Sequence, residues 1–326
     1  MLKQRILRPN FILVVLLLLG GLLVLCLGLQ SGLKSGTLPS GGYTVRDCRG
    51  AELQLPGKPQ RIASLSVSAD EMLLGLVGVE RLQAVSAWSG DPSVSCIAEQ
   101  VKQIPQRLRG GNAEAILALK ADLVVVPDYT REEVVKTLRE AGCLVYVCKT
   151  PHRLEEVKST LRELGKLVQE EQQAENMVRE LEQRLQKITR QVAAIPQEQR
   201  LEVLLLQENG SYYAPDSSFR EVCELAGLQD AAQKLHYSYP CILSQEEIVL
   251  LNPDAFIIED WNYDGRHDAK VLQKFVLSNK AYAGTKAYEQ QRAILIPASH
   301  LLTVSQYMVE GIEDMAVALY PKYVKR

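Results

Sequence analysis

The sequence predicts an α/β protein with two lobes of mainly parallel sheet, joined by a long and rigid inter-lobe helix. Two observations predict this class: a helix-to-strand motif that occurs twice, and an almost wholly helical segment between the two copies. The first copy, at residues 112–126, reads NAEAILALKADLVVV, and the second, at residues 244–258, reads SQEEIVLLNPDAFII. The offset of 132 residues is constant over the motif. A chain of 326 residues is long enough for two lobes with separate cores.

Each copy of the motif starts as a short helix and continues as a buried strand. Asn112 and Ser244 are good helix N-caps, and an acid two positions later, Glu114 or Glu246, lies beside the positive end of the helix dipole. Apolar residues at helical spacing follow, and then an apolar run typical of a strand buried on both faces. Stabilisation of the helix dipole is one sufficient explanation for the repeated glutamate, and a function at the exposed surface is the other.

The first folded segment contains a strand that ends in a serine-rich loop. The stretch RIASLSVSADEMLLGL predicts a strand over residues 61–65 and a helix over residues 69–76. Between them, Ser68 and Glu71 have the S-x-x-E spacing of a capping box. A loop of this kind, here containing Ser66, is also how α/β folds present backbone amides to a ligand. Ser66 is therefore a candidate ligand-binding residue.

Alternating strand and helix signals divide the folded part of the chain into two lobes around a linker. They run through residues 43–152, stop over residues 153–195 and resume over residues 196–326. The middle segment is helical and strongly charged, as a solvated helix face usually is. Gly165 is the one interruption that we expect before a long helix of about 25 residues.

The first 42 residues predict a membrane segment followed by a Gly/Ser-rich spacer. Three basic residues precede 19 uncharged residues at 11–29, and this run is longer than a secretory h-region of about 7 to 15 residues. Basic residues before the run and none directly after it place the N-terminus in the cytoplasm and the rest outside. Cys26 offers a lipidation site, although Leu25 stands where the bacterial lipidation signal has a small residue. A signal anchor and a lipoprotein both place the protein outside the bacterial cytoplasmic membrane, tethered to its outer face.

Charge and cysteine content narrow the environment and the partners. From Gly41 onward the chain has 33 Lys and Arg and 39 Asp and Glu. This mildly acidic balance gives no reason to expect nucleic acid as a partner. Six cysteines lie outside the apolar run, and six cysteines outside the cell allow 15 disulfide pairings. Cys143 and Cys148 should not pair, because five steps of strand place them about 16 Å apart on opposite faces. Neither CxxC nor HExxH occurs, and the four histidines have no ligand-like spacing, so no metal site is predicted.

Two exported and tethered α/β lobes around a helical linker resemble the substrate-binding proteins of bacterial ABC importers. The similar group is periplasmic binding protein class III, which has a helical backbone and captures cobalamin, haem or iron-siderophore complexes. The matching stretches are RIASLSVSADEMLLGLVGVERLQAVSAW, NAEAILALKADLVVV and SQEEIVLLNPDAFII, in the family's order. The resemblance covers about residues 43–321.

This resemblance implies a binding protein without catalysis or a cofactor of its own. It implies a monomer that holds an iron-siderophore, haem or corrinoid between its lobes and delivers it to an ABC permease and its ATPase. The positions that match the family's permease-docking residues are Glu114 and Glu246, one in each lobe. Glu247 adjoins the second of them and can substitute for it.

The ligand should lie between the lobes, at the carboxyl ends of the strands. The candidate residues are aromatic, cationic or serine side chains near predicted strand ends or in the loops before the two glutamates: Ser66, Trp88, Arg107, Arg109, Tyr129, Tyr212, Tyr213, Tyr237, Tyr239, Trp261 and His300. Thirteen tyrosines against four phenylalanines suit a wet aromatic surface. As a set, these residues favour a large flat or ring-shaped ligand.

The residues leave more than one chelate as the candidate ligand. Trp88 matches the family position where an aromatic often stacks on the ligand, and Tyr239 lies in the segment that often supplies another. Leu108 and Arg109 stand where the cobalamin-binding members carry Trp, which counts against cobalamin. Arg107 and Arg109 suit carboxylates of haem or of a siderophore, and a Tyr or His suits an axial haem ligand.

Two other classes of function are compatible with two α/β lobes. One is a membrane-anchored sensor or receptor that uses the same fold. The other is an enzyme, against which the sequence has no G-x-S-x-G elbow, no GxxxxGK[ST] loop and no evident acid-base pair.

Overall fold

The computed structural model describes residues 41–109, 112–207, 210–214, 217–262 and 268–326. The predicted membrane segment at residues 11–29, with Cys26, lies outside the described residues. Within the described ranges, no helix is both long and apolar enough to cross a bilayer.

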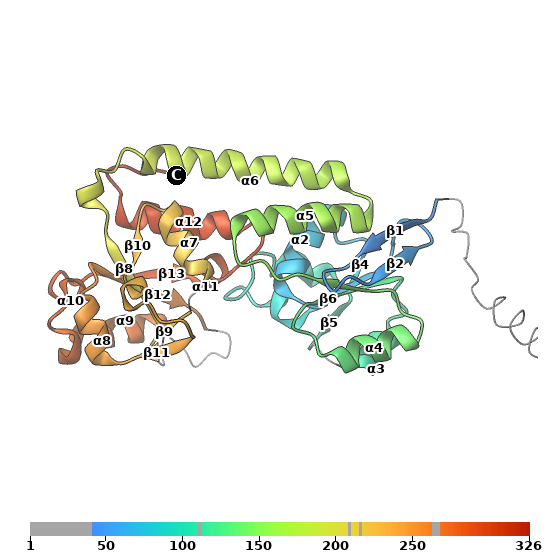
Figure 1. The fold of residues 1–326 in the computed structure, drawn as a ribbon, viewed down its shortest axis with the longest axis horizontal. Coiled ribbons are helices and arrows are strands. Elements are labelled where there is room, and N and C mark those ends of the chain that lie inside the picture. The colour runs from blue at the N-terminus through green and yellow to red at the C-terminus, as the bar shows by residue number, and fades with distance from the viewer. Residues whose placement is uncertain (1–40, 110–111, 208–209, 215–216, 263–267) are drawn as a thin grey trace, which may run out of the picture.

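The N-terminal lobe is built on a five-stranded parallel sheet with strand order β5-β4-β3-β6-β7 (Figure 1). A β-hairpin of β1 and β2 precedes the sheet, and three α-helices and two 3-10 helices connect its strands. The elements are β1 (Tyr43–Arg46), β2 (Glu52–Leu55), β3 (Ile62–Ser64), α2 (Val67–Val77), β4 (Leu82–Ser86), η1 (Ala87–Gly90), η2 (Gln100–Gln103), β5 (Gln106–Leu108), α3 (Ala113–Ala118), β6 (Leu123–Pro127), α4 (Glu132–Glu140) and β7 (Val145–Cys148).

The C-terminal lobe repeats this plan with a four-stranded parallel sheet in the order β10-β8-β12-β13 and a small antiparallel pair, β9 and β11. Its strands are β8 (Glu202–Leu206), β9 (Ser211–Tyr213), β10 (Gln229–Asp230), β11 (Cys241–Leu243), β12 (Ala255–Asp260) and β13 (Ala293–Pro297). Its helices are η3 (Gln197–Gln199), α7 (Ser218–Leu225), η4 (Ala231–Leu235), α8 (Gln245–Leu251), α9 (Ala269–Ser278), η5 (Lys280–Tyr282), α10 (Lys286–Glu289), α11 (Ala298–Leu301) and α12 (Met308–Leu319). The prediction of two mainly parallel α/β lobes is confirmed.

The repeated motif has the same local structure in both lobes. The Asn112 side chain accepts from the N–H of Ala115 at 3.1 Å at the start of α3, and Ser244 accepts from the N–H of Glu247 at 3.2 Å at the start of α8. The strands that follow, β6 and most of β12, are buried on both faces. The N-caps and buried strands that the sequence predicts are therefore present.

Both copies of the motif also contain an aspartate, Asp122 in the first and Asp254 in the second, and this residue joins neighbouring strands. Asp122 accepts from the N–H of Arg61 at 2.9 Å, just before β3, while Asp254 accepts from the N–H of Glu202 at 2.9 Å, at the start of β8. In each lobe this contact joins the strand after the motif to its partner in the sheet. The aspartate supplies an acceptor for a backbone donor at the amino edge of each sheet.

The predicted capping box at the start of α2 is wrong. The N-cap of this helix is Ser66, so Ser68 lies inside the helix and cannot cap it. Glu71 is buried, and its carboxylate turns away from the helix terminus toward the other lobe. The local spacing was right for a cap, but the chain entered the helix two residues earlier.

Two antiparallel helices form the linker, α5 (Leu154–Val168) and α6 (Glu171–Val192), and both lie along one side of the molecule (Figure 1). The break between them is at Gln169, whose φ is 54°, and the predicted break at Gly165 is wrong. Gly165 instead permits close packing, since a Cβ there would lie 2.6 Å from the Cβ of Ala174 on α6. With 22 residues, α6 is about 33 Å long and spans both lobes.

The long helix α6 is packed into both lobes. It lies against α2 of the N-terminal lobe and α12 of the C-terminal lobe as well as α5. Its buried residues Met177 and Leu181 belong to one apolar cluster that also contains Leu73 on α2 and Ile312 on α12. A continuous core of this kind opposes independent motion of the lobes.

We expect the lobes to move little when a ligand binds, because bending α6 would break this shared packing. X-ray scattering profiles of the free and loaded protein should therefore nearly coincide. A marked decrease in radius of gyration on loading would contradict a rigid linker.

Candidate ligand-binding site

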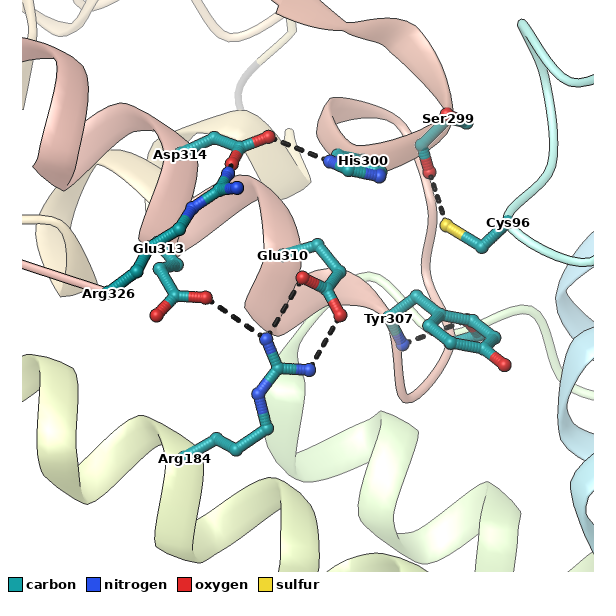
Figure 2. Close-up of polar contacts among 10 residues, drawn as sticks. Cys96, Arg184, Ser299, His300, Tyr307, Glu310, Glu313, Asp314 and Arg326 are labelled. Atoms are coloured by element: carbon teal, nitrogen blue, oxygen red, sulfur yellow. Dashed lines mark hydrogen bonds and ion pairs between the residues drawn. The ribbon is translucent and has the colours of Figure 1, made fainter.

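The two lobes meet at the carboxyl ends of their sheets. Cys96 lies in the segment after β4, and its Sγ is 3.3 Å from the carbonyl oxygen of Ser299, which follows β13 (Figure 2). Both residues come after parallel strands, so this contact brings the carboxyl edges of the two sheets toward each other. This edge is where α/β proteins place their ligands.

A buried carboxylate, that of Glu71, joins the lobes beside this contact. One of its oxygens accepts from Ser95 Oγ and from the N–H of Cys96, each at 2.9 Å. The other accepts from Thr303 Oγ1 at 2.7 Å and Ser305 Oγ at 2.5 Å, both in the segment that leads to α12. Burial raises the pKa of Glu71, and these hydrogen bonds oppose the rise. The four donors make Glu71 the centre of an inter-lobe polar joint.

A second polar group ties α12 to the linker. Arg184 on α6 donates to both carboxylate oxygens of Glu310 at 2.6 and 2.9 Å, and to Glu313 at 3.1 Å (Figure 2). Its hydrogen bond lowers the pKa of Glu310. On the same helix, Asp314 holds His300 Nδ1 at 2.7 Å, and this contact raises the pKa of His300. The ring of His300, a predicted ligand residue, is thus fixed by a carboxylate.

The loop that carries Trp88 is anchored on a buried carboxylate in α2. One oxygen of Asp70 accepts from the N–H of Ser86 at 2.7 Å and from Ser89 Oγ at 2.6 Å. The N–H of Trp88 donates to Ser86 Oγ at 3.3 Å. The Trp88 side chain is 47 % exposed, so a fixed loop presents an aromatic face to solvent.

Burial raises the pKa of Asp70 to about 8, and the hydrogen bonds from Ser89 and Ser86 oppose the rise. Because the folded pKa lies above the ordinary value of 3.8, the folded state holds an extra proton between these values. The corresponding stability is present below pH ~4 and is lost as pH rises to ~8.

We expect Asp70→Asn to remove this pH dependence, because the amide stays neutral at every pH. The melting temperature of the wild type should fall relative to that of the variant as pH rises from ~5 to ~8, with a free-energy change of up to a few kcal/mol. Differential scanning calorimetry measures it, with the exposed Asp260→Asn as control. A constant difference across this range would show that Asp70 titrates normally.

Other predicted N-terminal residues lie on or directly after strands of the same sheet. Arg107 on β5 donates to the carbonyl of Val101 at 2.8 Å, and its stem lies against Gly90 at the end of η1. Arg109, directly after β5, is exposed. Tyr129, after β6, is 72 % exposed, and the pKa of its hydroxyl is raised by desolvation, Asp128 and Asp70. The structure thus gathers these residues around the carboxyl edge of one sheet.

The C-terminal lobe supplies a stacked pair of tyrosines. The rings of Tyr237 and Tyr239 are 5.7 Å apart and nearly parallel at 15°, and Tyr239 is 59 % exposed. The hydroxyl of Tyr237 donates to Glu247, and this hydrogen bond raises the pKa of Tyr237 to about 12. The exposed outer ring of such a stack is a suitable surface for a flat ligand.

Tyr213 is a core residue and not a surface residue. It is 4 % exposed, its hydroxyl donates to the carbonyl of Tyr237 at 3.0 Å, and its ring packs edge-on against the same residue. Tyr213 is therefore buried and supports Tyr237, against which the exposed Tyr239 stacks, and its contact with a ligand stays a prediction. The side chain of Tyr212 lies outside the described residues.

Trp261 follows β12 and is half-buried. Next to it in the sheet, Gln207 after β8 donates to the carboxylate of Glu259 at 2.8 Å. Burial raises the pKa of Glu259, and the hydrogen bond from Gln207 opposes the rise. These residues place a carboxyl and an amide at the carboxyl edge of the C-terminal sheet. Ser66, at the corresponding edge of the N-terminal sheet, is 7 % exposed.

The two repeated glutamates are exposed at the starts of α3 and α8. Both helices lie on the side of the molecule away from α6, one in each lobe (Figure 1). Glu247 is engaged locally, because its carboxylate accepts from the N–H and the hydroxyl of Ser244 at 2.7 and 2.8 Å. Glu246, and not Glu247, is therefore the residue available to a partner.

The sequence did not reveal the buried carboxylates of Asp70, Glu71 and Glu259. A usable signal was present for the first two, because an acidic pair in an otherwise apolar helix has few routes to solvent. Their partners, in contrast, come from distant segments.

A cavity of about 360 Å³ lies away from these residues, beside Glu202 at the amino end of β8, and its lining includes Arg220 and Lys234. Among the described residues, no group of three or more His, Cys, Asp or Glu is arranged to hold a metal ion.

Comparison with known proteins agrees with this architecture. A probable siderophore-binding lipoprotein, YfiY of Bacillus subtilis, is 28 % identical over 123 residues, which are 37 % of this chain and 38 % of that protein. A cobalamin-binding protein of Halobacterium salinarum is 24 % identical over 284 residues, covering 85 % of this chain and 74 % of that protein.

Solved structures of haem-binding proteins have the same fold. The periplasmic heme-binding protein RhuT from Roseiflexus sp. RS-1 has a TM-score of 0.69 and 21 % identity, covering 80 % of this chain and 98 % of that one. A periplasmic heme-binding protein from Pseudomonas aeruginosa has a TM-score of 0.67 and 25 % identity, covering 81 % and 94 %. The family model described as periplasmic binding protein matches residues 62–300, and this chain therefore belongs to the periplasmic binding protein family.

Proposed function

We propose that this chain is the extracytoplasmic substrate-binding component of an ABC importer. It captures an iron or cobalt chelate between its lobes and delivers it to a permease that is driven by an ATPase. The observation that supports the proposal is an exposed aromatic surface in each lobe, Trp88 in one and Tyr239 stacked on Tyr237 in the other. Relatives whose names include a siderophore, cobalamin or heme support the ligand class.

The chemistry of the site suits a flat, anionic chelate. Exposed aromatic rings stack on a flat ligand or a ring system, and Arg107 and Arg109 can pair with its carboxylates. The rigid linker supports capture without wide closure. Among the three chelate classes, iron-siderophore, haem and corrinoid, the arginines favour one that carries free carboxylates.

The proposal is tested by titration of the purified chain from Gly41 onward, which carries every described helix and strand. Hemin, cyanocobalamin and ferric siderophores are added separately, and absorbance spectra and melting temperature are recorded. One class should shift the spectrum and raise the melting temperature, since a ligand that binds only the folded state stabilises it. No stabilisation by any class would remove the support for a chelate-binding function.

We expect Trp88→Ala and Tyr239→Ala each to weaken chelate binding by roughly 2- to 10-fold, since stacking on an aromatic ring contributes about 0.5–1.5 kcal/mol. Isothermal titration calorimetry measures the affinities. Phe275→Ala, which removes an exposed aromatic ring on α9, is the matched control and should bind as wild type does. Wild-type affinity in both test variants would place the ligand elsewhere.

Delivery to the permease is assigned to Glu114 and Glu246. Each is exposed at the start of a short helix, and the two helices occupy equivalent places in the repeated lobes. Two carboxylates fixed on one side of a rigid body provide a two-point contact for cationic groups of a permease. The apolar run at residues 11–29 tethers the protein to the outer face of the membrane that holds this partner.

A further inference from the structure

The turn between β1 and β2 lies against β7, the edge strand of the N-terminal sheet. The N–H of Cys48 donates to the carbonyl oxygen of Val147 at 3.1 Å. One oxygen of the Asp47 carboxylate accepts from the N–H of Val147 at 3.4 Å and from Arg139 Nη2 at 2.6 Å. The turn is therefore held along the edge strand by contacts in both directions.

These contacts place two cysteines on neighbouring stretches of backbone. Cys148 directly follows Val147, so it is one residue from the hydrogen bond that joins this stretch to Cys48. Hydrogen-bonded strands lie about 5 Å apart, and a disulfide joins residues whose Cα atoms are about 4.4–6.8 Å apart. The hydrogen bond between Cys48 and Val147 is therefore compatible with the Cα spacing of a cross-linked pair.

The electrostatics of Cys148 agree with a nearby Cys48. Burial raises the pKa of the Cys148 thiol, and the charge of Cys48 adds to the rise. Cys48 is exposed, whereas Cys148 is 5 % exposed, so a reagent in solution meets Cys48 first. Cys143 lies before the other end of β7, and Cys223 belongs to the C-terminal lobe.

We propose that Cys48 and Cys148 form an intramolecular disulfide once the chain is outside the cytoplasm. This inference rests on the extracytoplasmic location in the proposed function, because thiols stay reduced in the cytosol. The oxidant is a disulfide, either of a small thiol or of a thiol oxidoreductase. The Cys48 thiolate attacks one sulfur of the oxidant and displaces the first of its thiolates. The Cys148 thiolate then attacks the mixed disulfide at Cys48 and displaces the second.

This exchange is balanced in protons and electrons. The two protein thiols lose two protons and two electrons and form one S–S bond, and the oxidant disulfide gains them and leaves as two thiols. Raised thiol pKa values keep the thiolate fraction low at neutral pH, so the reaction should speed up as pH rises.

The cross-link would close a loop that contains the entire N-terminal sheet. It would also fix the turn whose Arg49 donates to the carbonyl oxygens of Asp128 at 2.9 Å and Thr130 at 2.5 Å. Those residues flank Tyr129, one of the candidate ligand residues. The disulfide would therefore stabilise both the lobe and one loop at the ligand edge.

The full-length chain, purified in detergent in its reduced state, tests the proposal by oxidation with excess oxidised glutathione at pH ~8. We expect the intact protein to lose the mass of two hydrogen atoms and peptide mapping to recover Cys48 joined to Cys148. The melting temperature should rise by about 5–10 °C, as closure of a long loop predicts, and fall again on reduction.

Two pairs of variants serve as tests and controls. Cys48→Ser, at an exposed position, and Cys148→Ser should each abolish the cross-linked peptide and the gain in melting temperature. Cys143→Ser and Cys241→Ser should retain both. Stable glutathione adducts at Cys48 without the cross-link, or a dominant bond between other cysteines, would overturn the proposal. The readout needs no chelate, so a failure of chelate binding would affect the proposed function and leave this result unchanged.

Discussion

Cells that rely on this chain for chelate uptake should lose transport when Glu114→Arg and Glu246→Arg are combined, while the purified double variant keeps its ligand affinity and its fold. Charged pairs across an interface are coupled by about 1.5–7 kcal/mol, whereas a helix-dipole contact at a surface contributes about 0.3–1 kcal/mol. Charge reversal replaces two attractions to permease cations by two repulsions. The stability of α3 and α8 should change far less.

The measurement pairs whole-cell uptake of the labelled chelate with calorimetric affinity and melting temperature. Glu180→Arg combined with Glu198→Arg is the matched control, because it makes the same change in net charge at exposed glutamates on α6 and η3. The control should transport normally. Normal transport by the Glu114 and Glu246 double variant, or a loss of its ligand affinity in solution, would rule out docking as the role of these glutamates.

Glu71→Ala should be among the most destabilising single substitutions in the protein. It removes a buried acceptor that receives four hydrogen bonds in the inter-lobe joint, from Ser95 Oγ, the N–H of Cys96, Thr303 Oγ1 and Ser305 Oγ. Each buried donor left without a partner costs about 1–3 kcal/mol, so we expect a loss of about 2–5 kcal/mol, allowing for partial rearrangement. Because two donors come from the segment leading to α12, the lobes should also separate more easily.

Urea unfolding measures the stability, and X-ray scattering of the folded variant measures the separation of the lobes. Glu71→Gln retains one acceptor oxygen and should lose much less stability than Glu71→Ala. Glu180→Ala, at an exposed position on α6, should have almost no effect. Equal losses in the Ala and Gln variants would mean that shape and not hydrogen bonding is what Glu71 contributes.

Local patterns were sufficient for the repeated units of the fold. A cap at Asn112 or Ser244 depends on a side chain and a backbone N–H three residues away. A strand that is buried on both faces is visible in the sequence as an uninterrupted apolar run. The fold class followed from the order of these units around a helical segment, and the class of protein followed from a family resemblance. The exposed glutamates could be named for the same reason, since a helix start places its second residue predictably.

The candidate site was only partly accessible in this way. Residues after strands, such as Trp88, Tyr129 and Trp261, were found because parallel strands end at one edge of a sheet. The exposure of these side chains could not be predicted, because it depends on which residues are their neighbours in space. Tyr213 and Tyr239 have the same side chain and both pack against Tyr237, yet the first is 4 % exposed and the second 59 %.

The sequence by itself determined the two α/β lobes, their helical linker and the equivalent positions of Glu114 and Glu246, because these depend on periodicity and capping over a few residues. Only the tertiary structure decided that Glu71 accepts hydrogen bonds from Thr303 and Ser305, 232 and 234 residues away, and does not cap its own helix. It also moved the linker break from Gly165 to Gln169, since Gly165 is the point of closest packing against Ala174. In both cases the choice depends on which distant segment supplies the neighbour, and no local spacing contains that information.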